Sequence, residues 1–381
     1  MNRQLRLRNL LSEQAPDAPL IDIGTTSMTG LHTGAKAPEL IQTALADPVC
    51  DILALAPEES VAFGSDFVRA GFLFPLPKPE NGVFTDAFGI QWSTEGGKPS
   101  PLTYPLESAD LARIKEYPKP AWDQPVQPNE PSVDDSGIVM ADAPCPGVLS
   151  LSLMLRNPWQ FIQDVAEKNS VVPALLDWAT ETVTDAYVHM LGRIPRQPDI
   201  IVYGDDLGTT DSMYFSPQEF REYILPHLEV LLRKIRALTP AAVCFHGCGA
   251  IKPILPDIAD LGIEIYHLDT TSKTMTVSDL RTVLPSRAVL HGTTDLCAMG
   301  AAVTHGDKAV TARLITHLAR SAPAIAAPMD SLAAPEQVAA ARVGGAFIRR
   351  IGREGFDQLR RYGPVRRLIE TAMTGIQTRE D

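Results

Sequence analysis

The chain has 381 residues, enough for one large α/β domain with a sizeable core or for two medium domains. Its net charge of −12 argues against nucleic acid as the main partner, because phosphate binding needs a basic surface. The five cysteines are scattered, and no apolar stretch suits a signal peptide or the roughly 20 residues of a membrane span, so we expect a cytoplasmic protein with free thiols and no membrane partner.

Eight short apolar runs, most of them rich in Val and Ile, are typical of strands covered on both faces. They span residues 19–23, 51–55, 137–141, 199–203, 242–245, 264–268, 288–291 and 324–327. Helical patterns follow most of them, at residues 37–46, 158–191, 217–238, 251–261, 277–284 and 307–319. A capping box of Ser216 and Glu219, with Pro217 at the first helical position, marks one helix start. The alternation predicts a (β/α)8 TIM barrel that forms one domain over residues 1–381.

An open doubly wound sheet is the alternative, but residues 23–28 read IGTTSM and lack the glycine-rich phosphate turn of that fold. Two segments interrupt the alternation. Residues 71–92 predict an N-terminal β-hairpin excursion with a turn at Asn81-Gly82, and residues 118–135 predict a surface loop. The arginine-rich residues 348–369 predict a solvated helix face, with a docking surface for an acidic partner as the alternative.

Polar residues gather at the ends of four successive predicted strands, where the active site of such a barrel lies. These residues are Asp205 and Asp206, then His246 and Cys248, then His267 and Asp269, and finally His291, Asp295 and Cys297. The strand bodies before them carry almost no such side chains. We therefore expect residues 199–300 to supply most of the pocket.

A metal site is predicted around His246 and Cys248. The two residues are two apart at a strand end and project to the same face, and imidazole with thiolate suits tetrahedral zinc. Asp269, His267 or Cys297 could complete the ligand set. The alternative is a buried cysteine beside a hydrogen-bonded structural histidine.

Acid–base and substrate-binding roles have candidates at the same strand ends. Asp205 or Asp206 could accept a proton, bind a substrate amine or orient a histidine, with a helix cap or a salt bridge as the alternative. His291 is a further candidate catalytic residue. His267 and Asp295 are candidate substrate-binding residues, although either could be purely structural.

Several motifs together resemble the uroporphyrinogen decarboxylase superfamily. They are GDDLGT at residues 204–209, SPQEFREYILP at 216–226, HGCG at 246–249, residues 255–262 and the GTTD turn at 292–295. Residues 84–92, FTDAFGIQW, resemble the early D-x-F/W-G hairpin of that superfamily. The resemblance covers roughly residues 45–345 and is strongest from 199 to 300, and it implies the same barrel fold.

Two branches of this superfamily differ in chemistry. The metal-free decarboxylases bind their polycarboxylic substrate through an arginine-rich N-terminal loop, and residues 19–33 here contain no arginine. The zinc-dependent corrinoid methyltransferases carry H-x-C followed by a cysteine on the last strand. His246 and Cys248 match the first part, but the last strand ends in Pro328-Met329. The third ligand would then come from Cys297, differ or be missing, and Asp269 lies about where members place an acidic ligand.

The resemblance thus implies a methyltransferase that moves a methyl group, with zinc, between a small molecule and a corrinoid (cobalamin) carried by a separate protein. A cofactor-free decarboxylase or lyase acting on another carboxylated substrate is the alternative, and it would use Asp205 or Asp206 to handle a proton. A non-catalytic or corrinoid-loading barrel is a third hypothesis. The resemblance is also compatible with a homodimer.

Overall fold

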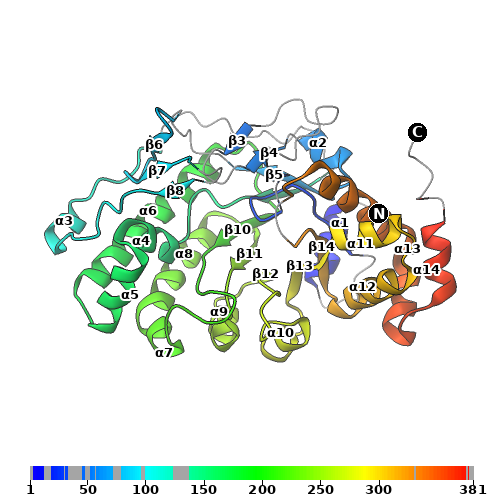
Figure 1. Cartoon of the computed structure of the whole chain (residues 1–381). Helices are drawn as coiled ribbons and strands as arrows, with labels where there is room; N and C mark the ends of the chain where they lie inside the picture. Colours follow the sequence, from blue (N-terminus) through cyan, green and yellow to red (C-terminus); the bar gives the residue numbers. More distant parts are fainter. Residues whose placement is uncertain are drawn as a thin grey trace.

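Eight parallel strands form the centre of the molecule in a computed structural model (Figure 1). The structure describes residues 3–12, 19–29, 31–32, 45–47, 52–55, 57–71, 79–95, 99–122, 137–329, 332–374 and 376. The strands are β1 (Leu20–Ile21), β5 (Phe67–Ala70), β9 (Ile138–Ala141), β10 (Ile200–Gly204), β11 (Ala242–Gly247), β12 (Ile265–Leu268), β13 (Val289–Asp295) and β14 (Ala324–Ala327). Their order is β1-β14-β13-β12-β11-β10-β9-β5. The first and last strands of this order, β1 and β5, come together where Asp66 N, directly before β5, donates to Ile21 O of β1 at 2.7 Å. The predicted (β/α)8 barrel is therefore confirmed.

Helices cover the barrel on its outside. In Figure 1, α4 (Val148–Arg156), α5 (Pro158–Ala166), α6 (Val171–Arg193) and α8 (Leu225–Leu238) lie on the left, and α11 (Leu296–Thr304), α12 (Lys308–Ser321), α13 (Pro335–Tyr362) and α14 (Arg366–Met373) on the right. Between them lie α9 (Leu255–Asp260) and α10 (Val277–Val283). None of the described helices combines the length and apolar character that a membrane crossing requires.

The predicted helix start at Ser216 is confirmed. Ser216 Oγ accepts from Glu219 N, and Glu219 Oε2 accepts from Ser216 N at 2.8 Å, so the first turn of α7 (Pro217–Glu219) has reciprocal caps. A π-helical turn, Phe220–Ile224, then leads into α8. The arginine-rich stretch lies on α13 and α14, where Arg349 pairs with Asp66 and Arg366 with Glu370. The Arg366 side chain is 87% exposed, which agrees with the predicted solvated helix face, and the docking surface stays an untested alternative.

The second predicted barrel strand, residues 51–55, was wrong. Its strand, β4 (Ile52–Ala54), pairs antiparallel with β2 (Leu31–His32) and β3 (Leu45–Asp47) in a separate sheet. The barrel position belongs to β5, which follows α2 (Pro57–Ala62) and carries a charged residue, Arg69. Periodicity shows that a segment is extended, but not which sheet it joins. The predicted helix at residues 37–46 ends in β3, and residues 37–44 lie outside the described part.

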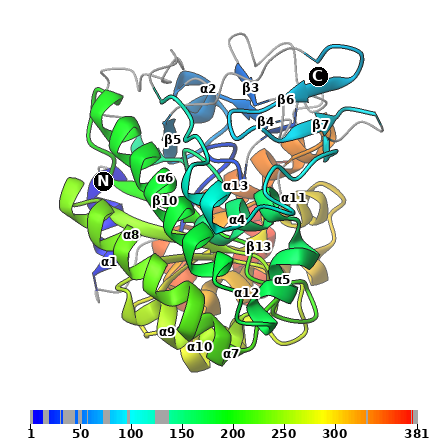
Figure 2. The ribbon, with the colours of Figure 1, turned by 90° about the vertical axis from the view of Figure 1, so that its left-hand side faces the viewer.

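The predicted hairpin excursion is present as β6 (Val83–Thr85), β7 (Gln91–Ser93) and β8 (Ser100–Pro101). Asn81 and Gly82 adopt φ values of 51° and 77°, which confirms the predicted tight turn. Both small sheets lie on the same side of the molecule in Figures 1 and 2. Residues 118–122 of the predicted surface loop are irregular, and 123–135 fall outside the described residues.

At the amino-terminal end of the barrel, three carboxylates accept backbone amide hydrogens in the same way. Three acidic residues each directly precede a strand and accept the amide hydrogen of a residue on the strand before it: Asp66 from Ile21, Asp199 from Val139 and Glu264 from Val243, at 2.8–2.9 Å. Each carboxylate therefore satisfies a backbone donor that the sheet leaves without a carbonyl partner.

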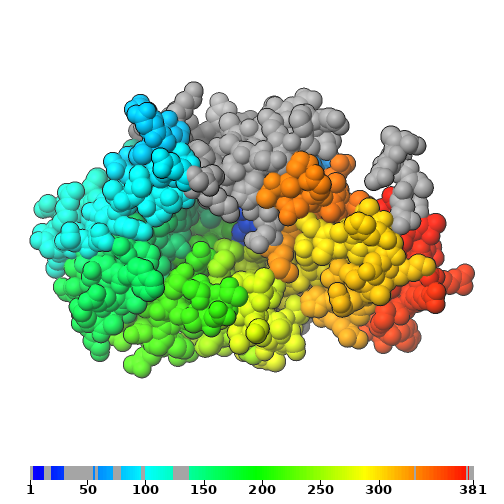
Figure 3. Space-filling model, viewed as in Figure 1, coloured from blue at the N-terminus to red at the C-terminus, as the bar shows by residue number. Residues whose placement is uncertain are grey.

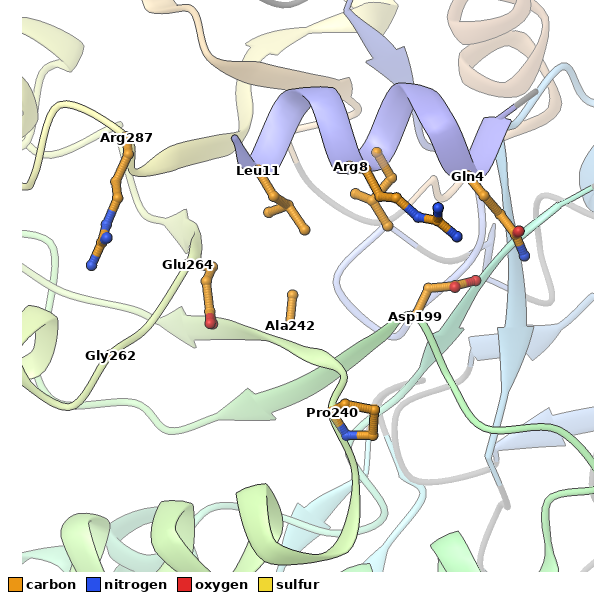
Figure 4. Close-up of a pocket in the computed structure, with 10 residues that line it drawn as sticks. Gln4, Arg8, Leu11, Asp199, Pro240, Ala242, Gly262, Glu264 and Arg287 are labelled. Carbon is orange, nitrogen blue, oxygen red and sulfur yellow. The ribbon is translucent and has the colours of Figure 1, made fainter. Parts of the chain in front are cut away.

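A pocket of about 430 Å³ opens at this end, between α1 (Arg3–Leu11) and the starts of strands β10 to β13 (Figure 4). Asp199 and Glu264 line it, yet both carboxylates are committed to the strand caps. The amino-terminal face of such barrels contributes stability rather than chemistry. We therefore assign this pocket to the structural end of the barrel.

Candidate functional site

A layer of polar side chains closes the apolar barrel interior at its carboxyl end. The buried interior includes Leu20, Phe67, Met140, Val202, Cys244, Ile265, Val289 and Ile325. Side chains two residues apart on a strand share a face, so the next interior positions are Asp22, Arg69, Asp142, Gly204, His246, His267, His291 and Ala327. The interior thus changes from aliphatic to ionisable within one layer, at the end where barrel enzymes carry their active sites. Figure 3 shows a hollow on the viewed face, between the green and the yellow-to-orange surfaces.

One member of this layer, His246, forms a cluster of three potential ligands with Asp206 and Cys248. His246 Nε2 lies 3.6 Å from Cys248 Sγ and 3.8 Å from Asp206 Oδ1. One ligand atom from each residue lies within 4.8 Å of the other two. The side chains of His246 and Asp206 are 23% and 53% exposed, so the cluster is open to solvent.

Backbone hydrogen bonds fix the two loops that bring these residues together. Asp205 N donates to His246 O at 3.0 Å, and Leu207 N donates to Cys248 O at 3.3 Å. Asp206 lies between these two bonds and therefore opposite the His246–Cys248 segment. The loops touch at Gly249, which has a φ of 104° and where a Cβ atom would lie 2.6 Å from the Gly208 backbone. Any side chain at Gly249 would push the loops apart.

Partial burial of His246 and full burial of His267 favour the neutral forms of both rings. Burial lowers the pKa of His246, although the Asp206 carboxylate opposes the shift. It also lowers the pKa of His267 well below the ordinary value, and the neighbouring His291 and His246 add to this effect. A neutral imidazole is the form that donates a lone pair to a metal ion.

The donor set suits zinc. Imidazole nitrogen, thiolate sulfur and carboxylate oxygen are all common zinc ligands. Zinc–ligand bonds of about 2.0–2.3 Å in a tetrahedron imply ligand–ligand separations of about 3.3–3.8 Å. The separation from His246 Nε2 to Cys248 Sγ, 3.6 Å, falls within this range, and the 3.8 Å to Asp206 Oδ1 lies at its upper limit. Three protein ligands and an open side are also the arrangement of catalytic zinc sites.

Asp205, the neighbour of Asp206, points away from the cluster. Its two oxygens accept from Leu149 N, Ser150 N, Ser150 Oγ and Tyr203 Oη at 2.7–2.9 Å. Burial raises its pKa to about 6, and these hydrogen bonds offset part of the shift by favouring the anion. Asp205 thus caps helix α4.

The capping carboxylate of α4 comes from Asp205, at the end of β10, because the N-cap residue of the helix has no side chain. That residue is Gly147, where a Cβ atom would lie 2.3 Å from Gly204 O and 2.5 Å from Asp205 Cγ. Only glycine lets the helix approach β10 this closely. The Asp205 carboxylate then bonds the second and third amides of the helix, which an N-cap side chain normally satisfies.

The side chain of His291 is more completely buried than those of the cluster. It is 0% exposed, and Nε2 lies 2.9 Å from the Asp22 carboxylate, which is also 0% exposed. The His291 ring packs against His267 with ring centroids 4.9 Å apart. This position fits a supporting role better than contact with a substrate.

Three further predicted site residues are not brought into the cluster. Asp269 Oδ1 accepts from Thr271 N at 2.9 Å, which forms a local turn. Asp295 caps helix α11 by accepting from Cys297 N at 2.9 Å. Cys297 Sγ contacts Gln337 O at 3.5 Å, and burial raises the pKa of this thiol to about 12. Asp206 therefore takes the place expected for Cys297 or Asp269 as the third potential ligand.

Sequence reasoning missed Asp22, Arg69 and Asp142 in the polar layer. Arg69 Nη2 lies 3.1 Å from Asp142 Oδ2 in a buried ion pair, and the same oxygen accepts from Ser27 N. A signal for them exists in the sequence, since each charge lies within or directly after an apolar strand run, two residues beyond an interior apolar side chain.

Fold and site together define a (β/α)8 barrel whose mouth carries a cluster suited to a catalytic metal. Residues 86–323, more than half of the chain, match the family model of uroporphyrinogen decarboxylase (URO-D). The chain belongs to this family.

Individual relatives are more distant. The methylcobamide:CoM methyltransferase MtaA of Methanosarcina barkeri is 28% identical over 146 residues, which make up 38% of this chain and 40% of that protein. The same enzyme from strain Fusaro is 27% identical over an equal length. A solved methyltransferase from Methanosarcina mazei superposes with a TM-score of 0.60 at 20% identity, over 91% of this chain and 98% of that one. This last likeness concerns the fold.

Proposed function

We propose that the protein is a zinc-assisted methyltransferase that moves a methyl group between a small molecule and a corrinoid carried by a separate protein. The Asp206–His246–Cys248 cluster at the barrel mouth is the observation that carries the proposal. The partial sequence similarity to a methylcobamide methyltransferase supports the class of reaction. The polar layer formed across the barrel supports treating the whole chain as one catalytic domain.

The three residues of the cluster would hold the metal ion, His246 through Nε2, Cys248 through its thiolate and Asp206 through a carboxylate oxygen. When bound, zinc supplies Lewis acidity, which lowers the pKa of a coordinated thiol or polarises another donor atom. The cluster is exposed on one side, where a substrate atom can approach. The loop contact at Gly249 and the two backbone bonds beside Asp206 keep the ligands in place before the ion binds.

The decarboxylase alternative receives less support from the same layer. Cationic side chains that have no other acidic partner are the usual binding groups for a substrate carboxylate. Among the eight interior positions of the polar layer, only Arg69 carries a guanidinium, and Asp142 neutralises it. Asp205, one of its candidate proton donors, is committed to helix α4.

Metal analysis tests the proposal. Wild type, Cys248→Ala and Cys297→Ala are purified from zinc-replete medium, and bound metal is measured by plasma mass spectrometry. We expect about one zinc ion per chain in wild type and in Cys297→Ala, and a large loss in Cys248→Ala. Methylcobalamin with a panel of small thiols then tests demethylation, followed through the cobalt absorption spectrum.

Two results would contradict the proposal. Wild type with well under one zinc per chain would remove the metal site, and full retention of zinc in Cys248→Ala would place the metal elsewhere. In the first case the cofactor-free decarboxylase becomes the favoured hypothesis, with Asp206 as the acid–base group that remains open to substrate.

A further inference from the structure

His246 uses its two ring nitrogens for different partners. Nε2 faces Cys248 and Asp206, while Nδ1 lies 2.9 Å from Nδ1 of His267. Two neutral rings at this distance share one hydrogen, so one nitrogen donates and the other accepts. The nitrogen that binds a cation must offer its lone pair. If His246 binds through Nε2, its hydrogen is on Nδ1 and is donated to His267.

His267 is enclosed so that its ring has little freedom to turn. It is 6% exposed and comes from β12, in register with His246 on β11 and His291 on β13. On one side lies the His291 ring, whose centroid is 4.9 Å from that of His267. His291 Nε2 in turn lies 2.9 Å from the Asp22 carboxylate. On another side lies Gly292, with a φ of 74°, where a Cβ atom would come 2.9 Å from His267 Nε2. A larger residue there would displace the ring.

We propose that His267 is a positioning residue for the metal site. It holds His246 in the Nδ1–H tautomer, with Nε2 directed toward Cys248 and Asp206, while Asp22 and His291 keep the His267 ring in place. This inference rests on the proposed metal site. It assigns His267 to the support of a ligand in place of the substrate-binding role that the sequence suggested.

The physical reason is that a ligand histidine binds best when its second nitrogen has a fixed acceptor. In metal proteins that acceptor is usually a carboxylate, a carbonyl or water, and its loss typically weakens metal binding 10- to 100-fold. Here the acceptor is a buried imidazole nitrogen.

Two substitutions at His267 distinguish the loss of the hydrogen-bond acceptor from a change in side-chain volume. His267→Asn can keep an amide oxygen near the position of Nδ1, whereas His267→Leu fills the space without an acceptor. Zinc and cobalt(II) dissociation constants are measured by chelator competition, together with the cobalt(II) absorption spectrum. We expect His267→Leu to weaken metal binding by about 10- to 100-fold and His267→Asn to stay within about threefold of wild type. Thermal unfolding of each variant checks the fold.

A metal-free readout makes the test independent of the proposed function. Histidine is labelled with ¹⁵N, and the His246 signals are identified by their absence in His246→Gln. The tautomer of His246 is then read from its nitrogen shifts in zinc-free protein. We expect the Nδ1–H form in wild type and in His267→Asn, and a loss of that preference in His267→Leu.

The outcomes are distinguishable. Wild type that binds no zinc while His246 keeps the Nδ1–H tautomer defeats the metal proposal and supports the positioning role. An Nε2–H tautomer in wild type, or equal metal affinity in His267→Leu and wild type, overturns the positioning role. Equal losses in both variants would show that His267 acts only through packing. If His267→Leu does not fold, wild type and His267→Asn still decide.

Discussion

Asp205 and Asp206 are adjacent carboxylates with opposite predicted responses to mutation. Asp205→Ala removes the acceptor of four hydrogen bonds, two of them from backbone amides in the first turn of α4. A buried donor left without an acceptor costs about 1–3 kcal/mol. Two such amides therefore predict a loss of about 4 kcal/mol in the free energy of unfolding. Asp206→Asn changes a half-exposed side chain and should cost about 0.5 kcal/mol or less.

The assay is urea-induced unfolding, followed by far-UV circular dichroism and tryptophan fluorescence. A chelator is present throughout, so that metal binding does not add to the stability of wild type. Asp205→Asn is the milder companion, because the amide keeps one acceptor oxygen, and it should lose about 2 kcal/mol. The effect on zinc content should be the reverse of the effect on stability. Asp206→Asn should lose zinc, whereas Asp205→Asn should retain it.

A free energy of unfolding for Asp205→Ala within about 1 kcal/mol of wild type would contradict this prediction, since the four hydrogen bonds would then contribute little net stability. An Asp206→Asn variant as unstable as the Asp205 variants would contradict it too. In that case both carboxylates would be structural, and Asp206 would not act only at the candidate site.

Three further outcomes are expected. Asp199→Ala leaves Val139 N without its carboxylate cap and should lower the free energy of unfolding by about 1–2 kcal/mol, with zinc content unchanged; a loss of zinc would link the two ends of the barrel. Gly249→Ala places a Cβ atom against Gly208 and should lower zinc affinity at least tenfold; unchanged affinity would mean that the loops can part freely. Removal of zinc by chelation should leave the far-UV circular dichroism spectrum unchanged, because a chain of this size buries its core without a metal; unfolding on chelation would make the site structural.

The barrel itself was largely accessible from the sequence. Seven of its eight strands follow from short apolar runs, most of them rich in Val and Ile, because strands covered on both faces are largely apolar. The start of α7 followed from local chemistry, since a capping box involves only neighbours in the chain. The exception was β5, where Arg69 interrupts the apolar pattern and its partner, Asp142, lies far away in the chain.

The centre of the candidate site was also accessible from the sequence, because His246 and Cys248 lie two residues apart at a strand end. The third member was not. Asp206 joins them only through the hydrogen bonds between the loops after β10 and β11. Asp269 instead bonds to the nearby Thr271, and Cys297 contacts Gln337 on helix α13.

Which of the two carboxylates, Asp205 or Asp206, caps a helix and which faces the cluster likewise depended on the tertiary structure. From the sequence the two carboxylates are equivalent neighbours, and only the close approach of Gly147 to β10 commits one of them to helix α4. Strand periodicity is a property of the local backbone, so the sequence alone indicates which residues can reach the barrel mouth. Which of them meet there depends on contacts between distant segments, and no local pattern encodes those contacts.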